Sequence, residues 1–238
     1  MYIYLVEINS IADSELSHLY QLMDSERSKR AQRFIKPKDK VRTIVGEILI
    51  RYLIIEKIGL KNKEINFDQN LYGKPFLEGF PSFHFNISHS GNYVLCVIND
   101  NEVGCDIEEI KPLNIEEIST AFFTNEECRY INSDSNNRLD KFYEIWTLKE
   151  SYIKCCGLGL SLSLKNFSMN ISKKGNISVV NRDNQYGYYE NLFQYTEISG
   201  YKIAVCSGGD VVKPNIITVD QNELISHFNS ICLQQERG

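Results

Sequence analysis

The most informative part of this sequence is the stretch Glu102-Val103-Gly104-Cys105-Asp106-Ile107-Glu108. Apolar residues alternate with small or acidic ones along it, which is typical of a β-strand with one buried face. We therefore expect a strand that separates a core from an acidic face. The core face would carry Val103, Cys105 and Ile107, and the acidic face Glu102, Gly104, Asp106 and Glu108.

The acidic face has two interpretations. Asp106 and Glu108 project side by side, and like charges so placed repel each other unless water or a cation lies between them. Gly104, on the same face, would leave room for a ligand to approach the backbone. Edge strands with solvated acids are common, so this segment alone favours the solvated interpretation.

A helix is predicted over residues 139–156, with Gly157 as its end. Trp146, Glu150 and Lys154 recur along it at a spacing of four and fall on one side. The simplest interpretation of the last two is an exposed ion pair, which stabilises a helix only slightly.

The alternative is that Glu150 supplies a third carboxylate, which meets Asp106 and Glu108. Carboxylate oxygens suit a hard cation such as Mg²⁺, which fills its remaining positions with water and substrate phosphate. Lys154, one turn further on, would then reach a phosphate oxygen near that metal.

The segment of residues 26–42 is basic, although the chain has a net charge of −5 at pH 7. A positive patch on an acidic protein suggests a polyanionic ligand of limited size, but a solvated junction between two helices would have the same composition. The net charge argues against a general nucleic-acid binder. The basic residues are Arg27, Lys29, Arg30, Arg33, Lys36, Lys38, Lys40 and Arg42.

Residues 84–91 are predicted to form a polar strand that ends in a glycine turn. His84, Asn86 and Ser88 share one face of it, and His89 stands at its end. A Ser-His-Ser-Gly turn can present a cation and hydroxyl groups to a phosphate, although a lone histidine is more often structural. The G-x-S-x-G pattern of serine hydrolases is absent, which disfavours that class.

The rest of the chain is predicted to mix helices and strands without a flexible linker. Residues 199–205 echo residues 90–96, which suggests two similar halves. The expected helices cover residues 13–30, 38–58, 115–123 and 126–131, and the expected strands cover residues 1–6, 83–87, 93–98, 103–107 and parts of 167–205. We expect an N-terminal half over residues 1–102, a C-terminal half over residues 103–210 and a tail over residues 211–238.

The composition is that of an ordinary soluble globular protein. Of the 238 residues, 42% are hydrophobic and 24% are charged, which excludes a disordered chain. No apolar run approaches the roughly 20 residues that a membrane-spanning helix needs. The apolar stretch of residues 1–6 ends at Glu7 and is too short to be a secretion signal. The seven cysteines contain no C-x-x-C pair, which indicates free thiols in a reducing cytosol.

Three segments together resemble the phosphopantetheinyl transferases of the surfactin-synthetase-activating (Sfp-like) type. They are FNISHS at residues 85–90, VGCDIE at residues 103–108 and WTLKESYIK at residues 146–154. Their order and separations make the signal far more specific than any one of them. The resemblance implies an α+β fold of two similar halves related by a pseudo-twofold axis, each a small, mainly antiparallel sheet packed with helices.

The resemblance also implies roles for individual residues. Asp106, Glu108 and Glu150 would bind the metal, Lys154 would hold or protonate the leaving phosphate, and Glu150 would activate the acceptor serine. Glu127 matches an acidic position sometimes linked to catalysis. The contacts to coenzyme A would come from Arg27, Arg30, Arg42, Lys74, Pro75, Ser88, His89 and Lys154, the three arginines holding its 3′-phosphate.

The implied reaction transfers 4′-phosphopantetheine from coenzyme A to a serine of an acyl or peptidyl carrier protein and releases adenosine 3′,5′-bisphosphate. Mg²⁺ is the implied metal, with Mn²⁺ as a substitute. The expected partners are carrier domains of nonribosomal peptide, polyketide or fatty acid synthases. We expect a cytoplasmic monomer with no nucleic-acid or membrane partner. Carrier docking would use Leu113, Ile115, Phe122 and Phe123, although core packing explains the phenylalanines equally well.

Two other functions stay open on the sequence. A magnesium nuclease would use the same carboxylates and lysine, but it would leave the histidine strand and the basic segment without a role. A nucleotide-binding regulator would keep the basic segment and use the acids only structurally. It predicts that coenzyme A binds independently of Mg²⁺ and that no product forms.

Overall fold

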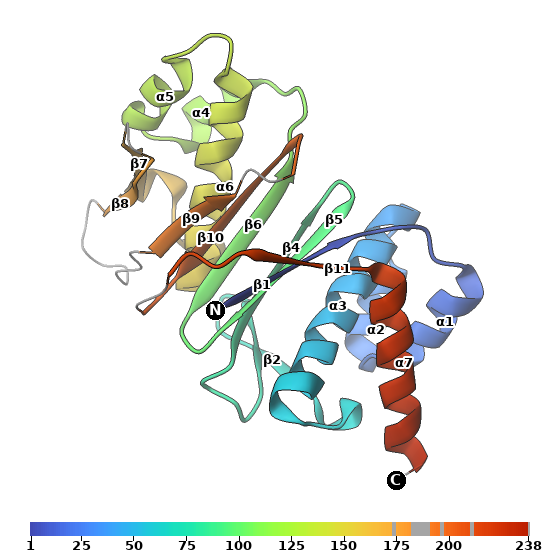
Figure 1. The fold of residues 1–238 in the computed structure, drawn as a ribbon. Helices are drawn as coiled ribbons and strands as arrows, with labels where there is room; N and C mark the ends of the chain where they lie inside the picture. Colours follow the sequence, from blue (N-terminus) through green and yellow to red (C-terminus); the bar gives the residue numbers. More distant parts are fainter. Residues whose placement is uncertain (173–174, 182–190, 196–197, 210–211, 238) are drawn as a thin grey trace.

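The computed structural model describes residues 1–172, 175–181, 191–195, 198–209 and 212–237. They form the α+β fold that the sequence predicts, with helices at both ends of the molecule and sheets between them (Figure 1). The α-helices are α1 (Asp13–Gln21), α2 (Ser25–Gln32), α3 (Pro37–Ile58), α4 (Ile115–Phe122), α5 (Asn125–Asn132), α6 (Arg138–Cys156) and α7 (Gln221–Arg237). Short 3₁₀ turns are η1 (Asn62–Glu64), η2 (Gly159–Ser161) and η3 (Leu164–Asn166).

The strands form two main sheets and two small ribbons. The first sheet, in the order β11-β1-β5-β4, consists of β11 (Ile216–Val219), β1 (Tyr2–Glu7), β5 (Tyr93–Asn99) and β4 (His84–Ser90). The second sheet, in the order β6-β10-β9, consists of β6 (Val103–Glu109), β10 (Tyr201–Ser207) and β9 (Asn191–Tyr195). The ribbons are β2 (Phe67–Gln69) with β3 (Pro75–Leu77), and β7 (Phe167–Ile171) with β8 (Ile177–Asn181). Residues 173–174, 182–190 and 196–197 of the predicted strand region lie outside the described residues.

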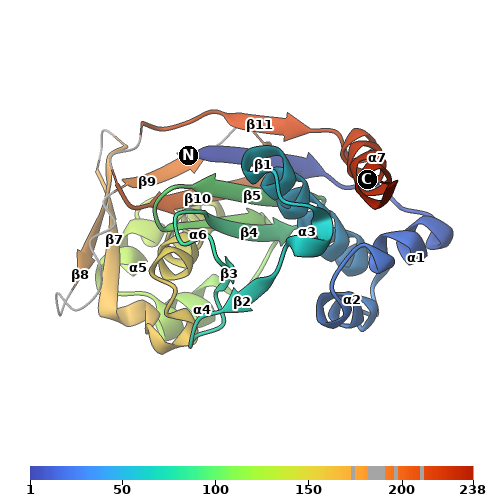
Figure 2. The ribbon, with the colours of Figure 1, turned by 90° about the horizontal axis from the view of Figure 1, so that it is seen from below.

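The two main sheets pack against each other, and each has its own helices on the outer face. α3 and α7 cover the first sheet, and α6 covers the second (Figures 1 and 2). The apolar side of the acidic strand faces the core between the sheets, which confirms the predicted alternation along β6. The inner core contains Ile3, Leu5, Leu95, Val97, Val103, Cys105, Ile107, Tyr195, Ile203 and Val205.

The two long helices end where the sequence predicts. α3 ends at Gly59, with φ 81°, and α6 ends at Gly157, with φ 68°. This left-handed conformation strains any residue with a Cβ, so glycine is the residue that can end the helix there. Pro37 in the first turn of α3 fixes its start, because the missing N–H would have no helical acceptor.

The single helix predicted over residues 13–30 is wrong, because the chain breaks between α1 and α2. Asp24 is extended there, and its side chain accepts a hydrogen bond of 2.8 Å from the N–H of Arg27. A capping aspartate of this kind starts a new helix more favourably than it continues an old one. Thr124 starts α5 in the same way, with a reciprocal bond to Glu127.

The tail predicted over residues 211–238 is also wrong for the part that the structure describes. β11 pairs in parallel with β1, with Ile3 opposite Ile216. α7 then lies along α3 and buries Leu224, Ile225 and Phe228 in the outer core of the first sheet. The end of the chain therefore completes the first sheet and its helical layer, because the apolar face of α7 needs a partner.

The two main sheets meet along β4 and β6 without forming a backbone ladder. Instead, alternate side chains of β4 reach the backbone of β6, and we call this contact the seam. Asn86 Oδ1 accepts the N–H of Cys105 at 2.8 Å, and Ser90 Oγ accepts the N–H of Glu109 at 3.1 Å. Between them, Ser88 Oγ lies 3.4 Å from the N–H of Ile107. The side chains thus satisfy backbone groups that would otherwise be buried without a partner.

Gly104 allows α6 to pack directly on β6. A Cβ added there would lie 2.1 Å from the carbonyl oxygen of Ser151 and 2.3 Å from the nitrogen of Cys155. The interpretation that this glycine makes room for a ligand is therefore incorrect, because the helix backbone fills the space. The close contact brings the Glu150–Lys154 turn of α6 over the acidic face of β6.

We expect Gly104→Ala to lower the free energy of unfolding by about 1–3 kcal/mol or more, because backbone atoms cannot move aside as side chains can. Denaturation in urea would measure the change. Gly46→Ala is a matched control, since its Cβ would first meet a side-chain atom of Ile87, at 3.3 Å. The control should change stability by no more than about 1 kcal/mol. Equal effects of the two changes would contradict the role given to Gly104.

Candidate active site

β4, β6 and α6 enclose a cavity of about 360 Å³, which we call the carboxylate pocket. It unites residues from three segments that are far apart in the sequence but that the motifs singled out. Trp146 and Ile87 complete its wall. The predicted site residues that line it are Ser88, His89, Asp106, Glu108, Glu150 and Lys154.

Asp106 is the most buried acid of the carboxylate pocket, with 3% of its surface exposed. Its Oδ1 accepts hydrogen bonds from Lys154 Nζ at 2.6 Å and from Ser88 Oγ at 2.9 Å. Its Oδ2 is buried and has no hydrogen-bond partner. Burial raises the pKa of this carboxyl, and the ammonium of Lys154 opposes that effect. The solvated interpretation of the acidic strand is therefore wrong for Asp106.

Glu108 and Glu150 are half-buried in the same pocket. Burial raises the pKa of each, and repulsion from Asp106 adds to it. Among the residues that the structure describes, no three Asp, Glu, His or Cys side chains stand close enough to hold a metal ion together. The three acids thus share a pocket, with Lys154 in contact with one of them.

Ser90 also contacts an acid of the pocket, although it is not among the residues predicted to bind the metal or coenzyme A. Its hydroxyl donates a hydrogen bond of 2.8 Å to Glu108 Oε2. The sequence does contain a pattern that points to Ser90. Ser88 and Ser90 are two residues apart on β4, as Asp106 and Glu108 are on β6.

Two cations lie near the histidine of the carboxylate pocket, Lys154 in its lining and Arg42 close to His89. Desolvation lowers the pKa of His89, and the nearby cations Arg42 and Lys154 lower it further. Burial disfavours the charged form of Lys154, but the attraction and hydrogen bond of Asp106, together with Cys105 and Glu150, outweigh it and raise the pKa of Lys154. Arg42 donates to the carbonyl of Gly91 at 2.9 Å and forms an ion pair with Asp39, and its Nε is buried without a partner. Lys154 and the free Nε–H of Arg42 can therefore attract an anion.

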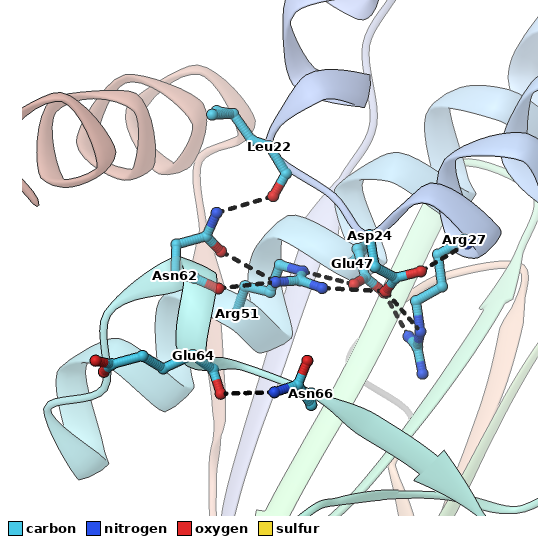
Figure 3. A network of polar contacts seen from close by, with 8 residues as sticks. All are labelled: Leu22, Asp24, Arg27, Glu47, Arg51, Asn62, Glu64 and Asn66. Carbon is cyan, nitrogen blue, oxygen red and sulfur yellow. Dashed lines mark hydrogen bonds and ion pairs between the residues drawn. The ribbon is translucent and has the colours of Figure 1, made fainter. Parts of the chain in front are cut away.

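Arg27 lies instead in a network of ion pairs between α2 and α3 (Figure 3). Its guanidinium is 2.5 Å from Glu47 Oε2 and stacks 4.2 Å above the ring of Phe67. Arg51 shares Glu47 with it, at 2.7 Å. Arg27 thus helps to attach α2 to α3, while Arg30 is exposed in the last turn of α2.

Lys74 and Pro75 line a second, mainly apolar cavity of about 240 Å³ at the other end of β4. Lys74 Nζ lies 2.6 Å from Glu102 Oε2 and 3.1 Å from the carbonyl oxygen of Cys155. The structure therefore does not bring Lys74 and Pro75 into the carboxylate pocket, although Lys74 contacts the end of the same helix, α6.

Comparison with known proteins identifies the family. The profile of the 4′-phosphopantetheinyl transferase superfamily matches residues 102–206, and a second profile, described as the N-terminal region of 4′-phosphopantetheinyl transferase, matches residues 10–100. The chain is 33% identical over 215 residues to the 4′-phosphopantetheinyl transferase Sfp of Bacillus subtilis, covering 90% of this chain and 95% of that protein. This chain belongs to the 4′-phosphopantetheinyl transferase family.

Two other relatives show how widely the similarity extends. The 4′-phosphopantetheinyl transferase gsp of Aneurinibacillus migulanus is 36% identical over 221 residues, which cover 89% of each chain. A human L-aminoadipate-semialdehyde dehydrogenase-phosphopantetheinyl transferase is 34% identical over 161 residues, 62% of this chain and 52% of that protein. The chain is thus a transferase that uses coenzyme A to activate carrier proteins, and no comparison supports the nuclease alternative.

Glu127 of this transferase lies in the core, and it does not line the carboxylate pocket. It is fully buried, and its Oε1 accepts hydrogen bonds from Lys149 Nζ at 2.6 Å and from the N–H of Met169 at 2.8 Å. Its Oε2 accepts the N–H of Thr124 at 2.8 Å. The pair with Lys149 therefore ties α5 to α6 and β7, away from the residues that line the carboxylate pocket.

We expect Lys149→Met to lower the free energy of unfolding by about 3–5 kcal/mol, because it leaves the carboxylate of Glu127 buried without a counter-charge. Adding Glu127→Gln removes that charge, and its single carbonyl oxygen can still accept one of the two backbone N–H groups. The double variant should therefore be more stable than Lys149→Met alone. Thermal or urea denaturation measures both. If each substitution lowered the free energy of unfolding and the two effects simply added in the double variant, the pairing of Lys149 with Glu127 would be contradicted.

Proposed function

We propose that the carboxylate pocket is where phosphopantetheine is transferred, and that Asp106, Glu108 and Glu150 hold a Mg²⁺ ion there. The observation that carries this is the buried Oδ2 of Asp106, an acceptor without a partner beside two further carboxylates. Oxygen donors of this kind suit Mg²⁺, with Mn²⁺ as a substitute. Binding a cation would also relieve the repulsion that raises the pKa of Glu108.

The phosphates of coenzyme A would lie beside the cations near the pocket. Lys154 and Arg42 supply the positive charge, while Ser88 and the imidazole of His89 supply polar groups beside it. We assign the 3′-phosphate to Arg42 and Arg30. Arg27 would have to leave Glu47 to take part, so we give it the structural role of holding α2. Lys74 and Pro75 remain candidates for contacts further along coenzyme A.

The chain's own groups would then manage the protons and charges of the transfer. The serine oxygen of the carrier protein bonds to the phosphorus that carries phosphopantetheine, and the bond to the adenosine-side phosphate breaks. Glu150, whose pKa burial raises, is the proposed base for the serine proton. Lys154 would stabilise the leaving adenosine 3′,5′-bisphosphate. When bound, Mg²⁺ neutralises the charge of the pyrophosphate.

We expect Glu150→Gln and Asp106→Ala each to lower the rate of transfer by roughly 10²–10⁴-fold. The first change removes the proposed base, for which this range is typical, and the second removes a proposed metal ligand. Mass spectrometry of an apo carrier protein incubated with coenzyme A and Mg²⁺ measures the gain of phosphopantetheine. Circular dichroism serves as the control for folding. Turnover within a few-fold of the unmodified enzyme would contradict these roles.

The same assay separates the transferase from a nucleotide-binding regulator. A regulator would bind coenzyme A equally with and without Mg²⁺ and would leave the carrier protein unmodified. A transferase adds phosphopantetheine only when Mg²⁺ is present.

Phe122 is the residue that we propose for docking the carrier protein. It is 45% exposed at the end of α4, and its ring meets Trp146, with centroids 6.4 Å apart. Because Trp146 lines the carboxylate pocket, a partner seated on Phe122 would hold its serine close to that pocket. Phe123 is only 3% exposed and belongs to the core, while Leu113 and Ile115 are half-buried against it.

We expect Phe122→Ala to raise the KM for the carrier protein about tenfold, which corresponds to roughly 1.4 kcal/mol of lost contact, with the KM for coenzyme A unchanged. Steady-state kinetics with each substrate in turn would measure both. The control is Phe123→Ala, which should instead lower stability by about 3–5 kcal/mol. A rise in both KM values for Phe122→Ala would contradict docking.

The proposed partners are carrier domains of nonribosomal peptide, polyketide or fatty acid synthases, and the proposed working form is a monomer in the cytosol. None of the described helices is long and apolar enough to cross a membrane. The acidic net charge also disfavours nucleic acid as a partner.

A further inference from the structure

We propose that Ser90 is a positioning residue for Glu108, which it orients as a metal ligand. The inference rests on the proposed metal site in the carboxylate pocket and adds to it a residue that does not itself line the pocket. It is carried by the seam between β4 and β6, where Ser90 contacts both the backbone and the side chain of the acidic strand.

The hydroxyl of Ser90 has a fixed orientation. Its oxygen accepts a hydrogen bond from the backbone N–H of Glu109 at 3.1 Å, and its O–H donates one to Glu108 Oε2 at 2.8 Å. A serine hydroxyl has a single hydrogen, and because the backbone contact occupies a lone pair, that hydrogen is available for the carboxylate. The backbone of β6 thus sets the direction in which Ser90 holds Glu108.

Ser88 repeats the same arrangement one pleat away. It donates to Asp106 Oδ1 at 2.9 Å and lies 3.4 Å from the N–H of Ile107. Each serine therefore binds one oxygen of one acid and leaves the other oxygen out of that contact. In Asp106 the other oxygen is the buried acceptor without a partner. The two serines at alternate positions of β4 match the two acids at alternate positions of β6.

Without its hydroxyl group, residue 90 could not hold Glu108 against the repulsion of Asp106, and the half-buried glutamate would be free to rotate away. Partners that orient metal ligands typically contribute 10–100-fold to metal affinity. Ser90 is the informative position because Ser88 is also a proposed contact of coenzyme A, so its loss would have two effects.

The test is Mn²⁺ binding by electron paramagnetic resonance, with adenosine 3′,5′-bisphosphate present and no carrier protein, so that turnover is not involved. We expect Ser90→Ala to weaken Mn²⁺ binding about tenfold. Ser90→Thr, which keeps the hydroxyl, should bind within about threefold of the unmodified enzyme. Asn86→Ser is the matched control, because it weakens the seam at Cys105 without contacting a carboxylate, and it should leave Mn²⁺ affinity unchanged.

The outcomes separate this inference from the function on which it rests. Unchanged Mn²⁺ affinity in Glu108→Gln would overturn the metal site itself. Weaker binding in Glu108→Gln with normal binding in Ser90→Ala would overturn only the positioning role. Equal losses in Ser90→Ala, Ser90→Thr and Asn86→Ser would also overturn it, since they would show a general effect of the seam.

Discussion

Where β4 meets β6, side chains of β4 accept hydrogen bonds from the backbone N–H groups of β6. This polar contact determines which residues β4 can carry and which side chains lie against the acids of β6. The face of β5 that packs in the inner core carries Leu95 and Val97, whereas the opposite positions on β4 are Ser88 and Asn86. An apolar side chain in their place would bury backbone N–H groups without acceptors. The seam therefore demands polar residues, and those residues then lie against the acids of β6.

Steric packing of α6 on the acidic face of β6 completes the constraint. α6 approaches so closely at Gly104 that its turn at Glu150 and Lys154 has little freedom to move relative to Asp106. Serines of β4 hold the edge of the strand and α6 packs on its acidic face, so its acids are presented at fixed positions. A rigid frame of this kind lowers the reorganisation needed when a charged substrate binds.

The sequence predicts much of this because the local rules are strong. The alternation along β6, the glycine ends of α3 and α6 and the spacing of Glu150 and Lys154 are all visible without coordinates. The role of Gly104, the pairing of Arg27 with Glu47 and the packing of α7 on α3 are not, since each depends on a partner distant in the sequence. Arg27 illustrates the difference: its charge is visible in the sequence, but the buried acid that uses it is not.

The seam also explains why the pocket is where it is. A continuous ladder from β4 to β6 would place the two backbones about 4.8 Å apart and leave no room for side chains between them. Bridging through serine and asparagine needs a wider spacing, and it has fewer backbone hydrogen bonds than a ladder. The seam keeps Asp106 almost fully buried, with one carboxylate oxygen that has no hydrogen-bond partner. At a buried site the attraction for a cation is stronger than at an exposed surface, so an arrangement with fewer backbone hydrogen bonds favours the proposed metal site.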